Sequence, residues 1–179
     1  YWRDGLQVEP GRVGEITVAG PTATDEYFAR PEATALAKIR ERLSDGTERI
    51  IHRMGDLGWI DQQGRLWFCG RKSHRVETTQ GPLFTEQVEP VFNTHPEVKR
   101  TALVGVGKPG EQTPVLCVEL HEDASSHKQE KIQRELEKIG NAFVHTGNIH
   151  RFLFHPGFPV DIRHNAKIGR EKLAMWATK

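Results

Sequence analysis

The chain has 179 residues, of which 27% are charged and 36% hydrophobic, and its formal net charge is +1. This balance is typical of a globular protein with a real core, and a charge so near zero argues against a dedicated nucleic-acid partner. The sequence contains no signal peptide and no apolar run of membrane-spanning length, and its two cysteines, Cys69 and Cys117, lie in apolar stretches. These features predict a cytoplasmic protein with buried thiols rather than disulfides.

The first part of the chain is predicted to be mainly β. Apolar residues alternate at Val13, Ile16 and Val18, which indicates a strand, and Pro31 is typical of the first position of a helix. The expected elements are a strand at 12–19, a helix from Pro31 to about Leu43, strands at 50–51 and 57–60, a turn at 61–64 and a returning strand at 65–69. Residues 1–71 should therefore form the β-rich end of a larger domain.

The pattern changes after Lys72, where helices and strands alternate. The expected elements are helices at 85–94, 127–144 and 169–177 and strands at 98–107, 114–121 and 149–154. The middle helix carries one apolar stripe that should pack in the core, and its members are Ile132, Leu136, Ile139 and Phe143. This order predicts a compact α+β unit over 72–179, so the whole chain is assigned to the α+β class.

Several familiar motifs do not apply to this chain. Residues 105–110 fit G-x-G-x-x-G, but a strand rather than a helix follows them, so they are predicted to be a loop between strands. The sequence has no Cys-x-x-Cys and no His-Glu-x-x-His, and no metal site is expected. It has no Gly-x-Ser-x-Gly, so a serine hydrolase has no support.

Three polar residues carry most of the functional information: Asp56, Arg71 and Lys167. Asp56 and Arg71 flank the predicted hairpin, so they should lie on one rim. A carboxylate can accept both hydroxyls of a ribose, and a guanidinium fork suits ribose or phosphate oxygens. A lysine supplies positive charge where negative charge develops in acyl or phosphoryl transfer. Taken singly, however, each of the three is more often a turn or surface residue.

Five segments in the same order resemble the C-terminal part of the adenylate-forming superfamily, which contains acyl-CoA synthetases, adenylation domains and luciferases. They are Gly14–Gly20, Tyr27–Thr34, Gly55–Asp56, Gly70–Arg71 and Lys167. The resemblance covers almost all of the chain. It implies that 1–71 is the C-terminal, β-rich part of the large AMP-binding domain and that 72–179 is a small, mobile α+β lid domain.

The resemblance also implies roles for single residues. Asp56 and Arg71 would bind the ribose of ATP, Lys167 would be the catalytic lysine, and Lys72 and Ser73 would form the hinge. The Ser/Thr/Gly-rich loop that holds the triphosphate in this superfamily is not in the sequence. ATP and Mg²⁺ are therefore expected to be bound mainly by an N-terminal part that the sequence lacks, and the chain is expected to be a fragment of an AMP-forming ligase.

Two departures from the superfamily pattern narrow the resemblance. Glu77 stands where most members have a lysine, and Ala166 precedes Lys167 where a glycine is usual. The run at 70–105 is most similar to the β-lactone synthetase branch of olefin biosynthesis. That branch implies activation of a long-chain β-hydroxy acid by ATP, closure of the acyl-adenylate to a β-lactone, and release of pyrophosphate and AMP. It also implies other olefin-pathway enzymes as partners.

Two other functions remain open at this point. One is a fatty acyl-CoA ligase or fatty-acyl-AMP ligase of the same superfamily, and Glu77 in place of lysine speaks mildly against the coenzyme A version. The other is a non-catalytic module that only docks partners. A docking surface needs none of Asp56, Arg71 and Lys167, so their joint presence speaks against that alternative.

Overall fold

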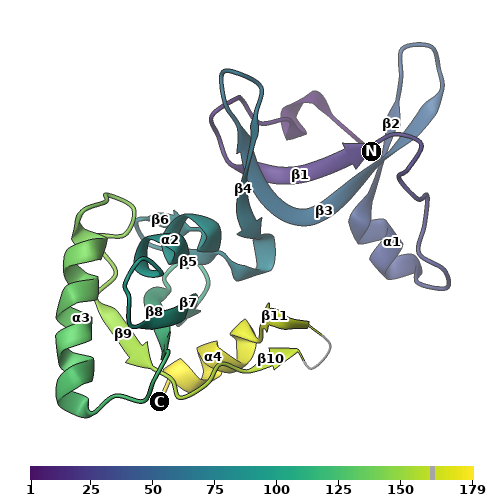
Figure 1. Cartoon of the computed structure of the whole chain (residues 1–179). Coiled ribbons are helices and arrows are strands. Elements are labelled where there is room, and N and C mark those ends of the chain that lie inside the picture. The colour runs from purple at the N-terminus through teal and green to yellow at the C-terminus, as the bar shows by residue number, and fades with distance from the viewer. Residues whose placement is uncertain (162–163) are drawn as a thin grey trace. The chain divides into compact units, whose positions relative to one another are not determined.

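The computed structural model describes residues 1–161 and 164–179. Within these residues the chain divides into two compact units, Tyr1–Ser73 and His74–Lys179 (Figure 1). Both contain strands and helices, so the α+β class predicted from the sequence is confirmed. The division falls just after Lys72 and Ser73, whereas the expected boundary lay before them. The assignment of the units to parts of a larger enzyme stays a prediction.

The first unit is built around one long strand, β3 (Glu48–Ile60). It pairs antiparallel with β1 (Gly14–Ala19), β2 (Lys38–Arg42) and β4 (Leu66–Arg71). Residues 51 and 52 pair with both β1 and β2, and residues 57 and 58 pair with both β1 and β4. β1 therefore lies along one edge of β3, while β2 and β4 follow one another along the other edge. A short 3-10 helix, η1 (Asp4–Leu6), precedes this sheet.

Helix α1 (Pro31–Ala37) begins at the predicted proline but is shorter than expected. Lys38–Arg42, which was predicted to continue the helix toward Leu43, forms strand β2, so that part of the prediction was wrong. Pairing with residues 48–52 gives this segment a hydrogen-bonded ladder, which overrides its helix-favouring composition. A turn with Gly46 at φ 84° closes the hairpin, and the Asp45–Gly46 pair is a hairpin signal that could have revealed it.

The β3–β4 hairpin agrees more closely with the elements predicted from the sequence. The strands predicted at 50–51 and 57–60 are one continuous strand in β3. The turn predicted at 61–64 is confirmed, because the Asp61 carboxylate accepts the backbone N–H groups of Gln63 and Arg65 at 2.9 Å each. Trp59 and Trp67 stack across the two strands with ring centroids 5.8 Å apart.

The second unit holds a three-stranded sheet in the order β7–β8–β9. Its strands are β7 (Val98–Val106), β8 (Thr113–Leu120) and β9 (Arg151–Phe154), and its helices are α2 (Thr85–Phe92), α3 (Ser126–Asn141) and α4 (Arg170–Ala177). β8 and β9 are parallel, and α3 provides the crossover that such a pair requires. Two small antiparallel pairs complete the unit: β5 (Val76–Thr78) with β6 (Gly81–Leu83), and β10 (Val160–Asp161) with β11 (His164–Ile168). A 3-10 helix, η2 (Lys72–His74), links the two units in sequence.

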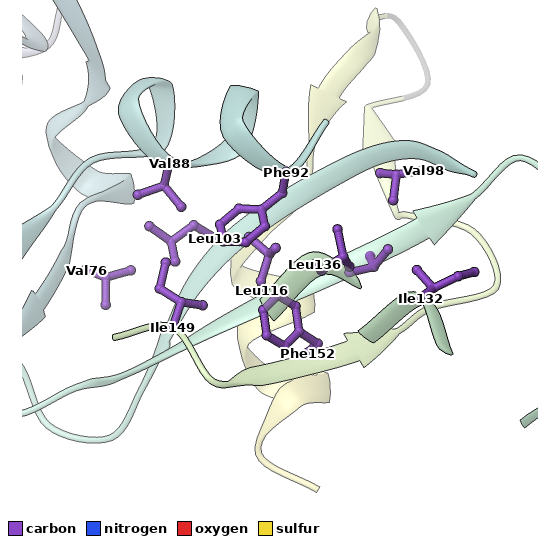
Figure 2. Close-up of a cluster of buried hydrophobic side chains, with 11 residues drawn as sticks. Val76, Val88, Phe92, Val98, Leu103, Leu116, Ile132, Leu136, Ile149 and Phe152 are labelled. Atoms are coloured by element: carbon purple, nitrogen blue, oxygen red, sulfur yellow. The ribbon is translucent and has the colours of Figure 1, made fainter. Parts of the chain in front are cut away.

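Side chains of this sheet alternate between two cores, one on each face. The core toward α2 and α3 is shown in Figure 2, and its buried members are Val76, Val88, Phe92, Val98, Leu103, Leu116, Val118, Ile132, Leu136, Ile149 and Phe152. The core toward α4 comprises Ala102, Val104, Val115, Cys117, Phe158, Leu173 and Ala177. Helix α4 is therefore fixed to the sheet through one buried face.

Most of the predicted apolar stripe of α3 is core. Ile132 and Leu136 are buried, and Ile139 packs beside them. The helix ends at Asn141, however, and Phe143 lies beyond it with 48% of its surface exposed. The prediction that the helix runs to 144 and carries Phe143 into the core was therefore wrong.

The remaining local predictions concern one loop and the two cysteines. The segment 105–110 leads from β7 into β8 through a loop, as predicted. Cys69 and Cys117 are both buried, also as predicted, and burial raises the pKa of Cys117 to about 11. In the described part of the chain, none of the helices has the length and apolar character needed to cross a bilayer.

Candidate functional site

Asp56 and Arg71 face each other across the β3–β4 hairpin. Their Cα atoms are register partners, and Arg71 Nη1 lies 3.2 Å from Asp56 Oδ1. The same nitrogen donates to the Met54 carbonyl at 3.0 Å. The Asp56 side chain is 24% exposed and the Arg71 side chain 57% exposed. The prediction that the hairpin brings these two residues to one rim is confirmed.

The backbone before each residue explains how the rim is built. Gly55 has φ 70° and Gly70 has φ 105°, values that L side chains rarely adopt and that glycine adopts freely. The β3–β4 register shifts between Leu57 and Gly58, next to this pair. Such an irregularity bends a strand and re-aims its side chains, so the two glycines let Asp56 and Arg71 face each other at the end of the hairpin.

This arrangement is chemically suited to a ligand that carries hydroxyl groups. A carboxylate has about four lone-pair sites and a guanidinium five N–H donors. The ion pair uses only part of that capacity, and both groups reach the surface. A vicinal diol could donate to Asp56 while Arg71 donates to a neighbouring oxygen.

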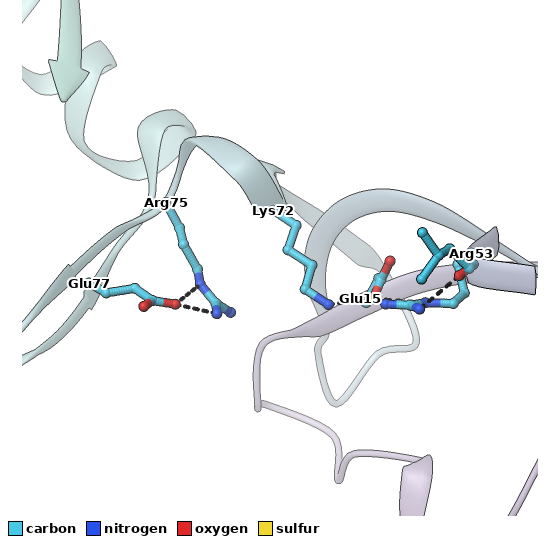
Figure 3. Close-up of polar contacts among 6 residues, drawn as sticks. Glu15, Arg53, Lys72, Arg75 and Glu77 are labelled. Carbon is cyan, nitrogen blue, oxygen red and sulfur yellow. Dashed lines mark hydrogen bonds and ion pairs between the residues drawn. The ribbon is translucent and has the colours of Figure 1, made fainter. Parts of the chain in front are cut away.

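Lys72, the first predicted hinge residue, is tied to β1. Its Nζ lies 2.8 Å from Glu15 Oε2, and the same oxygen accepts from Arg53 Nη2 at 2.7 Å and Nε at 3.2 Å (Figure 3). Burial pushes the pKa of Glu15 upward, but hydrogen bonds from Arg53 and Lys72 outweigh burial and hold the pKa below its usual range. Glu15 is a residue to which sequence reasoning gave no role, because its partners lie far away in the chain. Ser73, the second predicted hinge residue, follows Lys72 in η2.

Glu77 is also ion-paired. Arg75 donates to Glu77 Oε1 through Nε at 2.8 Å and through Nη2 (Figure 3). The backbone N–H of Glu77 donates to the side chain of Gln112 at 2.8 Å. The position at which the superfamily has a lysine thus holds a carboxylate whose charge is offset by a neighbouring arginine.

Lys167 lies on β11 in the second unit, and its side chain is exposed. Strand β11 pairs with β10 and ends two residues before α4 begins at Arg170. The predicted site residues are therefore distributed over both units: Asp56, Arg71, Lys72 and Ser73 belong to the first and Lys167 to the second.

A surface cavity of about 470 Å³ lies elsewhere on the first unit, at the start of α1. Its lining includes Tyr27, Arg30 and Lys38 but neither Asp56 nor Arg71. Among residues 1–161 and 164–179, no cluster of three or more His, Cys, Asp or Glu side chains is arranged to hold a metal ion.

Comparison with known proteins gives close relatives in sequence. No protein-family model matches the chain. The chain is 64% identical over 178 residues to the olefin beta-lactone synthetase of Xanthomonas campestris pv. campestris. The aligned region covers 99% of this chain and 32% of that protein. It is 62% identical over 177 residues to the olefin beta-lactone synthetase of Stenotrophomonas maltophilia, again 99% of this chain and 32% of the relative. The chain thus spans about a third of the length of these relatives.

Solved structures agree with the sequence comparison. The amide bond synthetase McbA from Marinactinospora thermotolerans superposes with a TM-score of 0.74 at 26% identity, over 99% of this chain and 34% of that one. The o-succinylbenzoate CoA synthetase of Bacillus subtilis, solved with its acyl-adenylate intermediate, shares the fold with a TM-score of 0.70 at 24% identity, over 96% of this chain and 32% of that one. The chain therefore has the fold of about a third of an adenylate-forming enzyme, and over nearly its whole length it is similar to the olefin beta-lactone synthetases.

Proposed function

We propose that this chain supplies the ribose contacts, the hinge and the lid lysine of an enzyme that uses ATP to convert a long-chain β-hydroxy acid into a β-lactone. The observation that carries the proposal is the Asp56–Arg71 pair at register positions of one hairpin, in a chain 64% identical to an olefin beta-lactone synthetase. Asp56 would accept the ribose hydroxyls, and Arg71 would donate to a neighbouring oxygen. The triphosphate, Mg²⁺ and the acyl chain would be held mainly by the other two-thirds of the enzyme.

The first step forms an acyl-adenylate. An oxygen of the substrate carboxylate attacks the α-phosphorus of ATP. The bond between that phosphorus and the oxygen bridging to the β-phosphate breaks, and pyrophosphate leaves. Two anionic groups approach each other in this step, so a positive charge placed between them lowers the barrier. Lys167 would supply that charge, and its exposed position on β11 suits a residue that meets the substrate only when the lid closes.

The second step closes the ring. The β-hydroxyl oxygen of the same substrate attacks the activated carbonyl carbon, the bond to the AMP oxygen breaks, and the hydroxyl proton passes to a base. Nucleophile and electrophile belong to one molecule, so proximity replaces a second substrate such as coenzyme A. The products are the β-lactone and AMP.

The lid would turn about Lys72 and Ser73 between the two steps. Hinges of this kind absorb the backbone change at a few residues that end or join elements. Lys72 lies at the first position of η2 and is held by Glu15 of β1. We propose that this ion pair is the fixed side of the hinge.

Coenzyme A ligases of the same superfamily are the competing function. From the sequence, Glu77 in place of lysine speaks mildly against coenzyme A, and one reason is that a carboxylate repels the phosphates of that ligand. The Arg75–Glu77 pair revises that reason, because Arg75 places a positive charge beside the carboxylate. Two observations still disfavour coenzyme A. Position 77 lacks the lysine that most members of the superfamily have, and the nearby Arg75 is already paired with Glu77.

Product analysis separates the two functions. The full-length enzyme for this test is a protein of the relatives' length that carries this chain, for example the Xanthomonas campestris relative with its matching third exchanged for these 179 residues. It is given ATP, Mg²⁺ and a long-chain 3-hydroxy acid, with and without coenzyme A. Release of AMP and a β-lactone in both reactions supports the proposal. Accumulation of acyl-CoA, or equal turnover of a fatty acid without the 3-hydroxyl, favours the ligase.

The same resemblance suggests the surroundings of the enzyme. We propose the cytoplasm as its compartment. We also propose other enzymes of olefin biosynthesis as its partners, because a 3-hydroxy acid must be made before this step and a β-lactone consumed after it. Co-purification of the full-length enzyme with its pathway neighbours tests the partners.

A further inference from the structure

The strand that carries Lys167 runs directly into a buried ion pair. β11 ends at Ile168, and after Gly169 helix α4 starts at Arg170. Only Ile168 and Gly169 therefore separate the exposed lysine from Arg170, whose side chain is only 13% exposed. Whatever fixes Arg170 also limits where β11 can lie.

Arg170 is held by a fork of hydrogen bonds. Its Nη1 and Nη2 donate to the two carboxylate oxygens of Glu89 on α2, the Nη2 bond measuring 3.0 Å. The Glu89 side chain is 10% exposed and also accepts the backbone N–H of Leu103 on β7 at 2.7 Å. Arg170 Nη1 donates in turn to the Leu103 carbonyl at 3.4 Å. One network thus joins α2, the central part of β7 and the first residue of α4.

The residues between the lysine and the ion pair are anchored as well. The backbone N–H of Gly169 donates to the Pro159 carbonyl at 2.7 Å, and Ile168 packs against the core under α4. Leu173, one turn into α4, is fully buried. The segment from Ile168 to Leu173 is therefore fixed at several points, and Lys167 is the exposed residue that precedes it.

A buried ion pair is a costly way to hold a helix in place. Removing two charges from water costs free energy that their attraction often does not recover, and apolar pairs of similar volume are commonly as stabilising. Burial raises the pKa of Glu89 although Arg170 opposes the shift, which shows that desolvation of this carboxylate is substantial. What a bidentate pair adds over apolar packing is direction, because the planar fork fixes both partners.

We propose, resting on the function proposed above, that Glu89 and Arg170 are positioning residues that aim Lys167 at the reacting carboxylate and α-phosphate. Neither touches the substrate. They act by fixing the start of α4, and thereby the strand from which Lys167 extends. A displacement of about 1 Å at a catalytic group can cost about 100-fold in rate, so loosening this network should slow adenylate formation while leaving the ribose contacts of the first unit unchanged.

The test uses the full-length enzyme and measures pyrophosphate release with ATP and a long-chain 3-hydroxy acid. Arg170→Lys keeps the charge but cannot form the fork, and the double variant Glu89→Gln with Arg170→Gln keeps hydrogen-bonding groups without any buried charge. Both should lower kcat by about 10- to 100-fold and leave KM for ATP within about twofold. Glu135→Gln is the control, because Glu135 on α3 binds His95 just after α2, and α3 packs in the core on the other face of the sheet from α4. It should leave kcat unchanged.

A double-mutant cycle separates positioning from general destabilisation. If the network acts through Lys167, adding Arg170→Lys to Lys167→Ala should slow the reaction no further. An equal loss in both backgrounds would overturn the proposal, as would unchanged kcat in both network variants or unfolding of both variants in circular dichroism. If the unsubstituted full-length enzyme releases no pyrophosphate, the proposed function is wrong and the positioning role falls with it. If that enzyme is active and slowed by Lys167→Ala alone, only the positioning role is wrong.

Discussion

Lys167 is the single residue on which the proposed chemistry depends most. In the full-length enzyme, Lys167→Ala should slow adenylate formation by about 100- to 1000-fold, the usual effect of removing one preorganised charge from a transition state. The exposed side chain predicts little change in the unfolding temperature. Single-turnover pyrophosphate release measures the effect. Lys172→Ala, on the exposed side of α4, is the control and should leave the rate near that of the unsubstituted enzyme. Equal rates for the two variants would contradict the role of Lys167.

Asp56 should control binding of ATP rather than the chemical step. Asp56→Ala removes the proposed acceptor of the ribose hydroxyls and leaves Arg71 with the Met54 carbonyl as its partner on β3. Loss of a charged hydrogen-bond acceptor costs about 1.5–3 kcal/mol, so KM for ATP should rise by about 10- to 100-fold. Titration of ATP in the pyrophosphate assay gives the value. Asp61→Ala, in the turn that joins the two strands of the same hairpin, alters the turn without touching the rim and should leave KM for ATP unchanged.

At the level of elements, the second unit is stabilised by helices packed on both faces of its sheet. Leu136 on α3 is fully buried in the core shown in Figure 2. Leu136→Ala should lower the free energy of unfolding by about 2–5 kcal/mol, because a lost buried side chain leaves a cavity. Phe143→Ala, at a position 48% exposed, should cost less than about 1 kcal/mol. Urea unfolding of both variants tests the contrast, and similar losses would show that Phe143 packs more than its exposure indicates.

The acid sensitivity of the second unit should depend on Glu119 at the end of β8. Burial pushes the pKa of Glu119 upward, but hydrogen bonds from Lys99, the Phe158 N–H and Arg100 outweigh burial and leave the pKa below its ordinary value. A carboxyl whose pKa is lower in the folded than in the unfolded state stabilises the fold above the unfolded value. That stabilisation is lost as the pH falls from about 4.5 through the folded value.

Glu119→Gln removes this titration. The variant should be less stable than the parent chain at neutral pH, and its unfolding temperature should fall less steeply below about pH 4.5. Thermal unfolding of the variant and of the parent chain, followed from about pH 6 to about pH 3, measures how steeply each unfolding temperature falls. Parallel curves over that range would exclude Glu119 as a source of acid sensitivity.

At the scale of the whole molecule, the two units differ in how much core they possess. The second has two buried clusters that cover both faces of its sheet. In the first, the buried hydrophobic residues among the described side chains are Ile51, Leu57 and Cys69, while Trp67 and Phe68 are about half exposed. Apolar surface of this kind is typical of a sheet that another layer covers.

This contrast predicts independent folding of one unit only. A fragment His74–Lys179 should fold cooperatively on its own, with dispersed amide signals in an NMR spectrum and a single thermal transition. A fragment Tyr1–Ser73 should aggregate or bind a hydrophobic dye, because its small core cannot offset the entropy of ordering the chain. A stable, monomeric first unit would show that its apolar residues need no cover.

Local patterns were enough for much of the second unit. The strands at 98–107 and 114–121, the buried stripe of Ile132 and Leu136 and the loop at 105–110 were all predicted correctly, because each depends on residues close together in the chain. The hairpin that pairs Asp56 with Arg71 was predicted for the same reason, since one turn joins its strands. The strand β2 was missed, because its composition favours a helix and only pairing with β3 makes it extended.

The sequence by itself thus determined the α+β class, the paired rim of Asp56 and Arg71, and the resemblance that gave Lys167 a role. The tertiary structure decided which side chains meet across long stretches of chain. Glu15 with Lys72 and Glu89 with Arg170 became visible only in the folded chain. Periodicity reports which face of an element is buried, but an ion pair depends on how separate elements are packed, and that is fixed by the whole core rather than by any local run of residues.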